Sequence, residues 1–564
     1  MSKYDAPLRD MRFAIYDVLD VESVYRRLPG CESATRDLLD AVLDEGAKFC
    51  QTVLAPLNKS GDAEGCHWEN GSVRTPKGFK DAYDQFVAGG WPSLVADPEY
   101  GGQGLPESFG SVLKEMIDSA NLSWGTYPLL SHGATESLRQ VGSEWQREVF
   151  LKPIVDGSWT GTMCLTEPHC GTDLGLLKTK AEPAADGTYN VTGTKIFITA
   201  GEHDFTDNII HLVLARLPDA PAGTRGISLF IVPKLKVDQA GKTTGRNAIS
   251  CGSIEHKMGI RGSATCVMNF DGAQGYLIGA PNKGLNAMFL MMNTARIAVG
   301  LQGLGLIERA YQNSLAYARD RLQMRSLSGA KRPDKPADPI IVHPDIRRLL
   351  LTQKAFAEGG RVLAYYAYLQ ADIVAKSADE AERKRADELL GFLTPIVKAM
   401  LTEAAIECTN HALQVFGGHG YVKEWGMEQF VRDARITTIY EGTTQIQALD
   451  LLGRKIMGLQ AAGLRHFLGE VGAFCQAQSG NPALAEFVAP LARLAQEWEQ
   501  LTREVGEAAM KDPEQVGAAA VDYLYYSGYV TLAYFWAREV AALGPAHGED
   551  FRASKLATAR FWYQ

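Results

Sequence analysis

The chain has 564 residues, too many for one hydrophobic core, so we expect several domains. Its 57 Lys and Arg residues and 66 Asp and Glu residues give a net charge of −9, which argues against a protein that binds nucleic acid through a basic face. A hydrophobic content of 46% with 22% charged residues excludes wholesale disorder. Nine cysteines without a CxxC pair indicate neither a disulfide framework nor a metal site.

We expect neither a targeting segment nor an integral membrane segment. The start of the chain, residues 1–7, lacks a positive charge followed by an apolar run. Apolar stretches are broken by charge or Gly before about 18 residues, the length that a transmembrane helix needs. These features predict a cytoplasmic protein.

Residues 1–157 are expected to form an N-terminal extension and a helical domain. Apolar residues at helical spacing predict helices over residues 36–43, 79–86 and 111–120. A glycine loop, Glu-Tyr-Gly-Gly-Gln-Gly at 99–104, separates the last two.

Residues 158–280 are expected to form a β-domain. Short runs rich in Val, Ile, Thr and Phe predict strands over residues 189–199, 208–217, 226–233 and 253–270. Turns with Pro, Gly and Asp separate them, as at 218–223. The pattern is typical of a small antiparallel barrel or sandwich.

Residues 281–457 return to helical spacing and predict an antiparallel helical bundle. One long helix is expected over residues 284–321, with glycines at 300, 303 and 305 that permit close packing. Four prolines predict a loop at 331–344, and two further long helices are expected over 343–377 and 379–415.

Residues 458–564 are expected to form an appended helical domain. The segment is rich in Tyr, Phe and Trp, which core packing explains best. From residue 457 onward it has eight Lys or Arg and twelve Asp or Glu residues, a net charge of −4, which argues against a nucleic-acid-binding arm.

Two stretches in the β-domain carry polar groups suited to a ligand. Cys-Leu-Thr-Glu-Pro at 164–168 is followed by Gly171-Thr172-Asp173, a loop whose hydroxyl and N–H groups can cradle a phosphate or the polar edge of a ring. Phe197 and Thr199 end a strand on the same face, where one can pack on a planar cofactor and the other can hydrogen-bond it. The alternatives are a hydrogen-bonded turn and an ordinary strand end.

The sharpest motif is Tyr440-Glu441-Gly442-Thr443. A single carboxylate lies between an aromatic residue and Gly, at a break between two helices. In an apolar pocket the pKa of such a Glu rises, and it can act as a base near neutral pH. A solvated or ion-paired side chain is the alternative for a lone Glu.

In this order and spacing the motifs resemble those of the acyl-CoA dehydrogenase flavoproteins, over about residues 35–455. Arg-Leu-Gln-Met at 321–324 and Gln-Val-Phe-Gly-Gly at 414–418 complete the set. The resemblance implies an α+β fold with an N-terminal helical domain, a middle antiparallel β-domain and a C-terminal four-helix bundle, followed here by the appended helical domain. It also implies FAD, bound between the β-domain and the bundle and reaching into a neighbouring subunit.

The resemblance assigns roles to single residues. Thr166 and Thr199 should hydrogen-bond the flavin ring, Phe197 should pack on it, and Thr172 should meet the pyrophosphate. The residues expected to bind FAD are Met163, Leu165, Thr166, Gly171, Thr172, Phe197, Thr199, Arg321, Gln323, Met324, Gln414, Gly417, Gly418, Thr443 and Gln445. Those expected to bind the substrate are Thr172, Arg296, Tyr440 and Gly442.

Glu441 is the implied catalytic base. It should remove the proton α to an acyl-CoA thioester carbonyl while the β-hydrogen leaves as hydride to FAD, giving a trans-2-enoyl-CoA. Some family branches place the base just before an Arg on the long helix. Here that neighbourhood reads Asn293-Thr294-Ala295-Arg296 and offers no carboxylate.

Three features resemble the bacterial branch that contains 3-methylmercaptopropionyl-CoA dehydrogenase: the start at residues 4–11, the proline-rich insert at 331–344 and the long region after residue 458. Candidate substrates are 3-methylthiopropanoyl-CoA and medium-chain, long-chain or aryl-acyl-CoA. The expected electron acceptor is electron-transferring flavoprotein, and the expected assembly is a homodimer in which the appended domain takes the place of a second dimer. Two alternatives are an acyl-CoA oxidase that uses oxygen and a DNA-associated flavoprotein, which the acidic tail disfavours.

Overall fold

The computed structural model describes residues 3–564, except the side chains of residues 289–294. The chain forms two compact units, which we call the bundle unit (Met1–Ala55, Pro106–Ala120 and Arg296–Gln564) and the sheet unit (Pro56–Leu105 and Asn121–Ala295). Helices α6 (Glu107–Val141) and α9 (Gly284–Asp320) contribute residues to both, and α6 is interrupted at Asn121, where φ is −159°. The four domain boundaries expected from the sequence stay a prediction.

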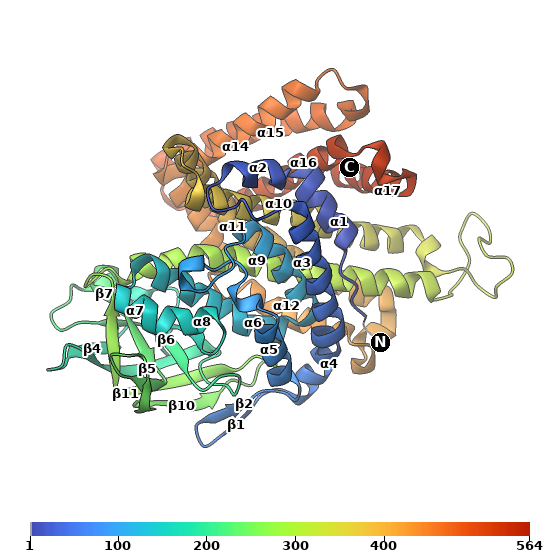
Figure 1. The fold of residues 1–564 in the computed structure, drawn as a ribbon. Coiled ribbons are helices and arrows are strands. Elements are labelled where there is room, and N and C mark those ends of the chain that lie inside the picture. Colours follow the sequence, from blue (N-terminus) through green and yellow to red (C-terminus); the bar gives the residue numbers. More distant parts are fainter. Residues whose placement is uncertain (1–2) are drawn as a thin grey trace. The chain divides into compact units, whose positions relative to one another are not determined.

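The sheet unit contains the strands and several short helices (Figure 1). Its remaining helices are α4 (Ala55–Glu64), α5 (Phe79–Ala88), α7 (Glu144–Gln146) and α8 (Lys152–Val155). Its strands are β1 (His67–Glu69), β2 (Ser72–Arg74), β3 (Thr160–Cys164), β4 (Lys180–Pro183), β5 (Tyr189–Thr199), β6 (Ile209–Arg216), β7 (Ile227–Pro233), β8 (Leu235–Val237), β9 (Thr243–Arg246), β10 (Ile249–Ile254) and β11 (Thr265–Ile278).

The main sheet has seven strands in the order β10-β11-β5-β4-β6-β3, and β7 pairs with both β11 and β6. Strands β11, β5, β4, β6 and β7 therefore close a ring, as in a barrel. Most pairs are antiparallel, as expected, but β6 runs parallel to β3 and to β4. The expected strand over 253–270 is two strands, because residues 255–264 contain two glycines and several charges and form a loop.

The bundle unit is helical. Besides its parts of α6 and α9, it contains α1 (Leu8–Arg12), α2 (Val21–Arg27), α3 (Arg36–Phe49), α10 (Pro344–Lys376), α11 (Glu380–Phe416), α12 (Met427–Thr437), α13 (Thr444–Leu449), α14 (Ala462–Gln478), α15 (Ala485–Lys511), α16 (Glu514–Ala542) and α17 (Glu549–Tyr563). The three long helices predicted from periodicity are confirmed as α9, α10 and α11. Asp379 caps α11 by accepting hydrogen bonds from the N–H groups of Ala381 and Glu382.

Helices α9 and α11 pack at short range because of two glycines. A Cβ at Gly303 would lie 2.5 Å from the Leu401 carbonyl oxygen, and one at Gly300 would lie 2.7 Å from Val397. Only Gly permits this approach, which agrees with the role expected of these glycines.

Helix α11 alone, within the described residues, is long and apolar enough to cross a membrane. However, 78% of its most apolar 18-residue window is buried inside the protein, as in the core helix of a bundle.

The aromatic residues of the appended helices form a core, as expected. Trp498, Phe535 and Trp536 are fully buried, whereas Tyr529 is 48% exposed. The Trp536 indole N–H donates to the carbonyl of Ala355 on α10 at 3.2 Å, which ties α16 to the bundle.

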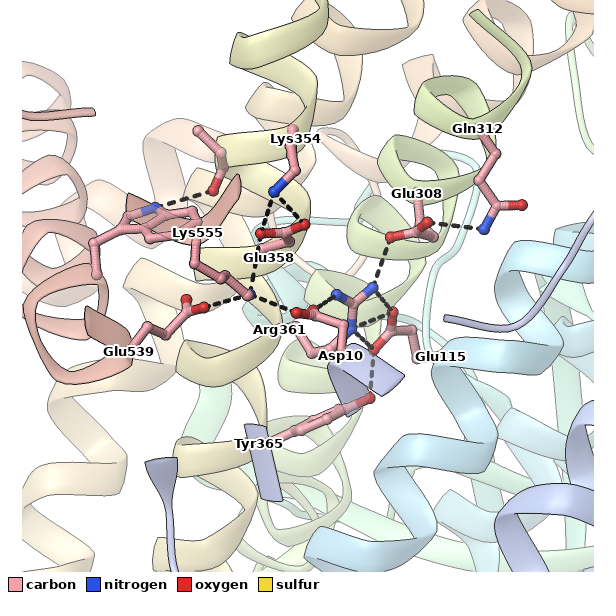
Figure 2. Close-up of polar contacts among 12 residues, drawn as sticks. Asp10, Glu115, Glu308, Gln312, Lys354, Glu358, Arg361, Tyr365, Glu539 and Lys555 are labelled. Atoms are coloured by element: carbon pink, nitrogen blue, oxygen red, sulfur yellow. Dashed lines mark hydrogen bonds and ion pairs between the residues drawn. The ribbon is translucent and has the colours of Figure 1, made fainter. Parts of the chain in front are cut away.

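A buried ion cluster joins the N-terminal segment, the bundle and the appended helices (Figure 2). Arg361 pairs with Asp10, with Glu115 at 2.7 Å and with Glu308 at 2.7 Å. Lys555 of α17 also pairs with Asp10, and it contacts Glu358 at 3.0 Å and Glu539 at 2.5 Å. Lys354 pairs with Glu358 as well, at 2.6 Å, so one arginine and two lysines hold segments that are far apart in the sequence.

Candidate active site

The Glu441-Gly442 turn connects α12 to α13. Both residues have left-handed backbone conformations, with φ of 54° at Glu441 and 91° at Gly442. For a residue with a side chain this conformation costs on the order of 1 kcal/mol, and it persists only where the surroundings hold it. At Gly442 a Cβ would lie 2.5 Å from the side-chain nitrogen of Gln447, so the turn also needs glycine there.

Three side chains hold this turn. The ammonium of Lys398 donates to the Gly442 carbonyl at 2.7 Å, and the Gln447 amide donates to the Glu441 carbonyl at 3.2 Å. The Thr444 hydroxyl donates to the carboxylate of Glu403. The turn is therefore fixed from α11 and α13 together.

The Glu441 carboxylate is half-buried and accepts no hydrogen bond from the described residues. Burial raises its pKa above the ordinary value, while the charges of Arg296 and Lys398 partly offset that rise. Arg296 is itself buried, 3.5 Å from Asp450. Such a carboxylate has an open lone pair and a raised proton affinity, which suits a base.

Tyr440, the residue before the carboxylate, is anchored to the bundle. Its hydroxyl donates to the side-chain oxygen of Gln302 on α9, a fully buried residue. Thr443 on the other side caps α13, since its hydroxyl accepts from the Ile446 N–H at 3.3 Å.

In the sheet unit, a buried lysine shapes the loop after β3. Lys195 of β5 donates to the Leu165 carbonyl and to the Glu167 carboxylate, both at 2.9 Å. Burial alone would raise the pKa of Glu167, but the Lys195 charge and hydrogen bonds from Lys178 and Thr179 hold it at about 2. The loop with Thr166 is thus held rigidly against β5.

A β-bulge turns Phe197 outward. Ile198 pairs with Cys266 and Lys195 pairs with Met268, so Ile196 and Phe197 face one residue of β11. Phe197 has a φ of 59° and its side chain is 60% exposed. Bulges commonly redirect a side chain in this way beside functional sites.

Near this exposed ring lie two hydroxyl groups without an internal partner. The side-chain oxygens of Thr166 and Thr199 form no hydrogen bond within the described part of the chain, although both residues are half-buried. The Ile196 N–H donates to the Thr166 carbonyl at 2.9 Å, which keeps the two predicted motifs side by side. Met163 lies buried in β3, and Gly171 and Thr172 are exposed.

A third group of predicted residues lies where α9 and α11 end. Tyr317 stacks on Phe416 with ring centroids 4.1 Å apart, and its hydroxyl bonds to His419 at 2.9 Å. Six predicted residues follow Tyr317 or flank Phe416 in the sequence, and all are exposed: Arg321, Gln323, Met324, Gln414, Gly417 and Gly418.

Four family models match the chain in order. They are the acyl-CoA dehydrogenase N-terminal domain over residues 37–158, its middle domain over 162–273, its C-terminal domain over 282–457, and an acetyl-CoA dehydrogenase C-terminal-like domain over 467–564. The chain belongs to the acyl-CoA dehydrogenase family.

Comparison with individual proteins supports this assignment to the family. The chain is 44% identical to 3-methylmercaptopropionyl-CoA dehydrogenase of Ruegeria pomeroyi, over 100% of this chain and 95% of the relative. It is 34% identical to the broad-specificity linear acyl-CoA dehydrogenase FadE5 of Mycobacterium tuberculosis, over 100% of this chain and 95% of the relative. The structure of ACDH-11 of Caenorhabditis elegans in complex with C11-CoA has a TM-score of 0.80 at 19% identity, covering 100% of this chain and 92% of that one.

The family and the fold class expected from the sequence are therefore confirmed, with the parallel strand pairs as a difference in detail. The roles expected of single residues stay predictions. Asn293 and Thr294, in the neighbourhood considered for an alternative base, lie outside the residues whose side chains are described; Ala295 there is buried and carries no carboxylate.

Sequence reasoning missed the residues that hold the site. Lys398, Gln447 and Gln302 were not singled out, nor was Lys195 behind the Thr166 loop. For Lys398 a signal existed, since it is a lone charge within the apolar run Leu393–Leu401 of a predicted helix. Such a charge is almost never buried without a partner.

Proposed function

We propose that this acyl-CoA dehydrogenase family member uses FAD to introduce a double bond between the α and β carbons of an acyl-CoA thioester, with Glu441 as the base. The observation that carries the proposal is the Glu441 carboxylate itself. It lies in a left-handed turn, has a pKa raised by burial, and accepts no hydrogen bond from the described residues.

The sheet unit offers groups that fit a flavin. The unpartnered hydroxyls of Thr166 and Thr199 suit the polar edge of the ring, and the exposed Phe197 side chain suits its face. Thr172 and Gly171 form an exposed loop that suits the pyrophosphate. We propose further FAD contacts in the bundle unit, made by Thr443, Gln445 and the six exposed residues at the ends of α9 and α11.

The chemistry of the bundle unit follows from the Glu441 turn. The Glu441 carboxylate takes the α-proton, the electrons of that C–H bond form the new Cα=Cβ bond, and the β carbon loses a hydride. FAD, when bound, supplies the acceptor for this hydride. The Glu441 backbone N–H has no acceptor among the described residues and can donate to the thioester oxygen, where negative charge develops. Tyr440, Gly442, Thr172 and Arg296 are the proposed substrate contacts.

For the acyl group we propose 3-methylthiopropanoyl-CoA, because the relative with 44% identity over the full chain carries the corresponding name. Medium-chain, long-chain and aryl-acyl-CoA are the other candidates. We further propose electron-transferring flavoprotein as the electron acceptor, a homodimer as the assembly and the cytoplasm as the location.

The test is anaerobic bleaching of the flavin by a panel of short, long, phenyl-substituted and methylthio acyl-CoA substrates. The Glu441→Gln variant should keep FAD but reduce it about 10²- to 10⁴-fold more slowly. Glu380→Gln, at the exposed start of α11, is the matched control. Near-normal turnover in Glu441→Gln would contradict the assignment, and faster reoxidation by air than by electron-transferring flavoprotein would favour an oxidase.

A further inference from the structure

We propose that Lys398 is a positioning residue for the Glu441 base, fixing the Glu441-Gly442 turn through its ammonium and supplying a positive charge that favours the carboxylate form. This inference rests on the proposed function, because it concerns how the proposed base is held and charged. Lys398 lies outside the motifs that carry the family resemblance.

The first observation is where Lys398 lies. It is fully buried in the middle of α11, between Val397 and Ala399, which are also fully buried. A buried ammonium is costly unless it is paired, so its retention there calls for a partner. Its one side-chain hydrogen bond within the described residues goes to the Gly442 carbonyl at 2.7 Å. That partner is the residue directly after the base.

The second observation is the backbone that Lys398 holds. Glu441 adopts a φ of 54°, which an L-residue rarely adopts unless tertiary contacts impose it. The two hydrogen bonds to the carbonyls of this turn come from Lys398 and Gln447. Without Lys398, the neutral Gln447 contact at 3.2 Å is the one hydrogen bond from a described side chain that remains on the turn carbonyls. The orientation of the carboxylate therefore depends on both side chains.

The third observation is the positive charge that Lys398 places near the Glu441 carboxylate. The cations that face Glu441 are Arg296 of α9 and Lys398 of α11, and both lower its pKa against the effect of burial. The Tyr440 hydroxyl also faces Glu441, and it stays neutral because burial, Asp118 and Glu441 raise its pKa. Arg296 also forms an ion pair with Asp450, and Lys398 also interacts electrostatically with Glu403 on its own helix. Burial lowers the pKa of Lys398 to about 8, so it is largely protonated at neutral pH. Gln447 can share the geometric role of Lys398 but not this electrostatic one.

The experiment compares four variants in the full-length FAD-loaded protein. Lys398→Met removes donor and charge, Lys398→Gln keeps a donor without charge, and Lys398→Arg keeps both. Lys384→Met makes the same change at an exposed position of α11. The readouts are the pH dependence of anaerobic flavin reduction by acyl-CoA and hydrogen exchange of the backbone amides of residues 438–447.

We expect the acid limb of the rate profile to move up by about one pH unit in both neutral variants, since an opposite charge at close range lowers a carboxyl pKa by at least that much. The limiting rate should fall on the order of 10²-fold in Lys398→Met through misplacement of the base. Exchange at 438–447 should quicken in Lys398→Met, and Lys398→Arg should restore both properties. Lys384→Met should match the wild type.

A folded, FAD-loaded Lys398→Met with the wild-type acid limb and wild-type exchange would overturn the inference. Failure of both neutral variants to fold would also overturn the inference, because Lys398 would then be required for folding and not for positioning the base. If no acyl-CoA reduces the wild-type flavin, the proposed function fails instead, and exchange at 438–447 still reports whether Lys398 fixes the turn.

Discussion

The guanidinium of Arg296 and the carboxylate of Asp450 lie 3.5 Å apart, and both side chains are buried. Asp450 also contacts Arg454 at 3.3 Å, and it begins the π-helical segment Asp450–Gly458 that follows α13. Arg296 therefore interacts with two carboxylates, Asp450 and Glu441, and it lowers the pKa of Glu441. We expect the negative charge of Asp450, which draws Arg296 toward itself, to raise the proton affinity of the proposed base.

Asp450→Asn should lower the pKa of Glu441. The substitution removes a nearby negative charge and leaves Arg296 free to favour the Glu441 carboxylate. In the proposed reaction the acid limb of the profile of kcat/KM against pH should then move to lower pH, opposite to the effect expected for Lys398→Met. An upward movement, or none, would show that Asp450 does not compete with Glu441 for Arg296.

Local patterns predicted much of the fold. The periodicity of residues 284–321, 343–377 and 379–415 depends on neighbouring residues alone, and each segment forms the expected helix. The turn at Glu441 was likewise marked by an aromatic residue, a carboxylate and a glycine in succession. The sequence could not distinguish a barrel from a sandwich, because that depends on β7 pairing with the distant strand β11 as well as with its chain neighbour β6.

The supporting contacts of the site could not be predicted for a similar reason. Phe197 is exposed because β5 carries a bulge opposite β11, and a bulge is set by strand register. Lys398 meets Gly442 across 44 residues of sequence, through the packing of α11 against the turn. Spacing along one segment carries no information about such contacts.

Gly303→Ala should destabilise the protein by about 1 to 3 kcal/mol, the usual cost of overpacking a core. The added Cβ would lie 2.5 Å from the Leu401 carbonyl and would force α9 away from α11. A Cβ at Gly469 of α14 would have no neighbouring atom within 4 Å, so Gly469→Ala should instead stabilise the protein by about 1 kcal/mol through helix propensity. Urea unfolding of both variants measures the difference, and equal effects would contradict the packing argument.

Lys555→Met should destabilise the protein by about 3 to 5 kcal/mol, because it leaves buried carboxylates without their shared ammonium. Lys555 contacts Asp10, Glu358 and Glu539, which belong to α1, α10 and α16. Adding Glu539→Gln to Lys555→Met should recover part of the loss at pH 8, because the buried Glu539 carboxyl then no longer has to bind a proton on folding. Lys511→Met, exposed at the end of α15, should change little, and an equal loss there would rule out the ion cluster as the cause.

Glu539 should make stability depend on pH between about 4.5 and 7. Burial raises the pKa of this carboxyl from 4.5 to about 7, with Lys555 opposing the rise. Below pH 4.5 the group is protonated in both the folded and the unfolded chain, and its contribution to stability is fully present. Between 4.5 and about 7 only the unfolded chain releases the proton, so the free energy of unfolding falls as pH rises. The loss should reach the order of 2 to 3 kcal/mol near pH 7.

Glu539→Gln mimics the protonated form and removes this slope. In urea unfolding from pH 4.5 to 8, the free energy of unfolding of the variant should therefore rise relative to that of the wild type as pH rises. A variant that instead loses stability relative to the wild type at pH 8 would mean that the ionised Glu539 stabilises the fold through Lys555.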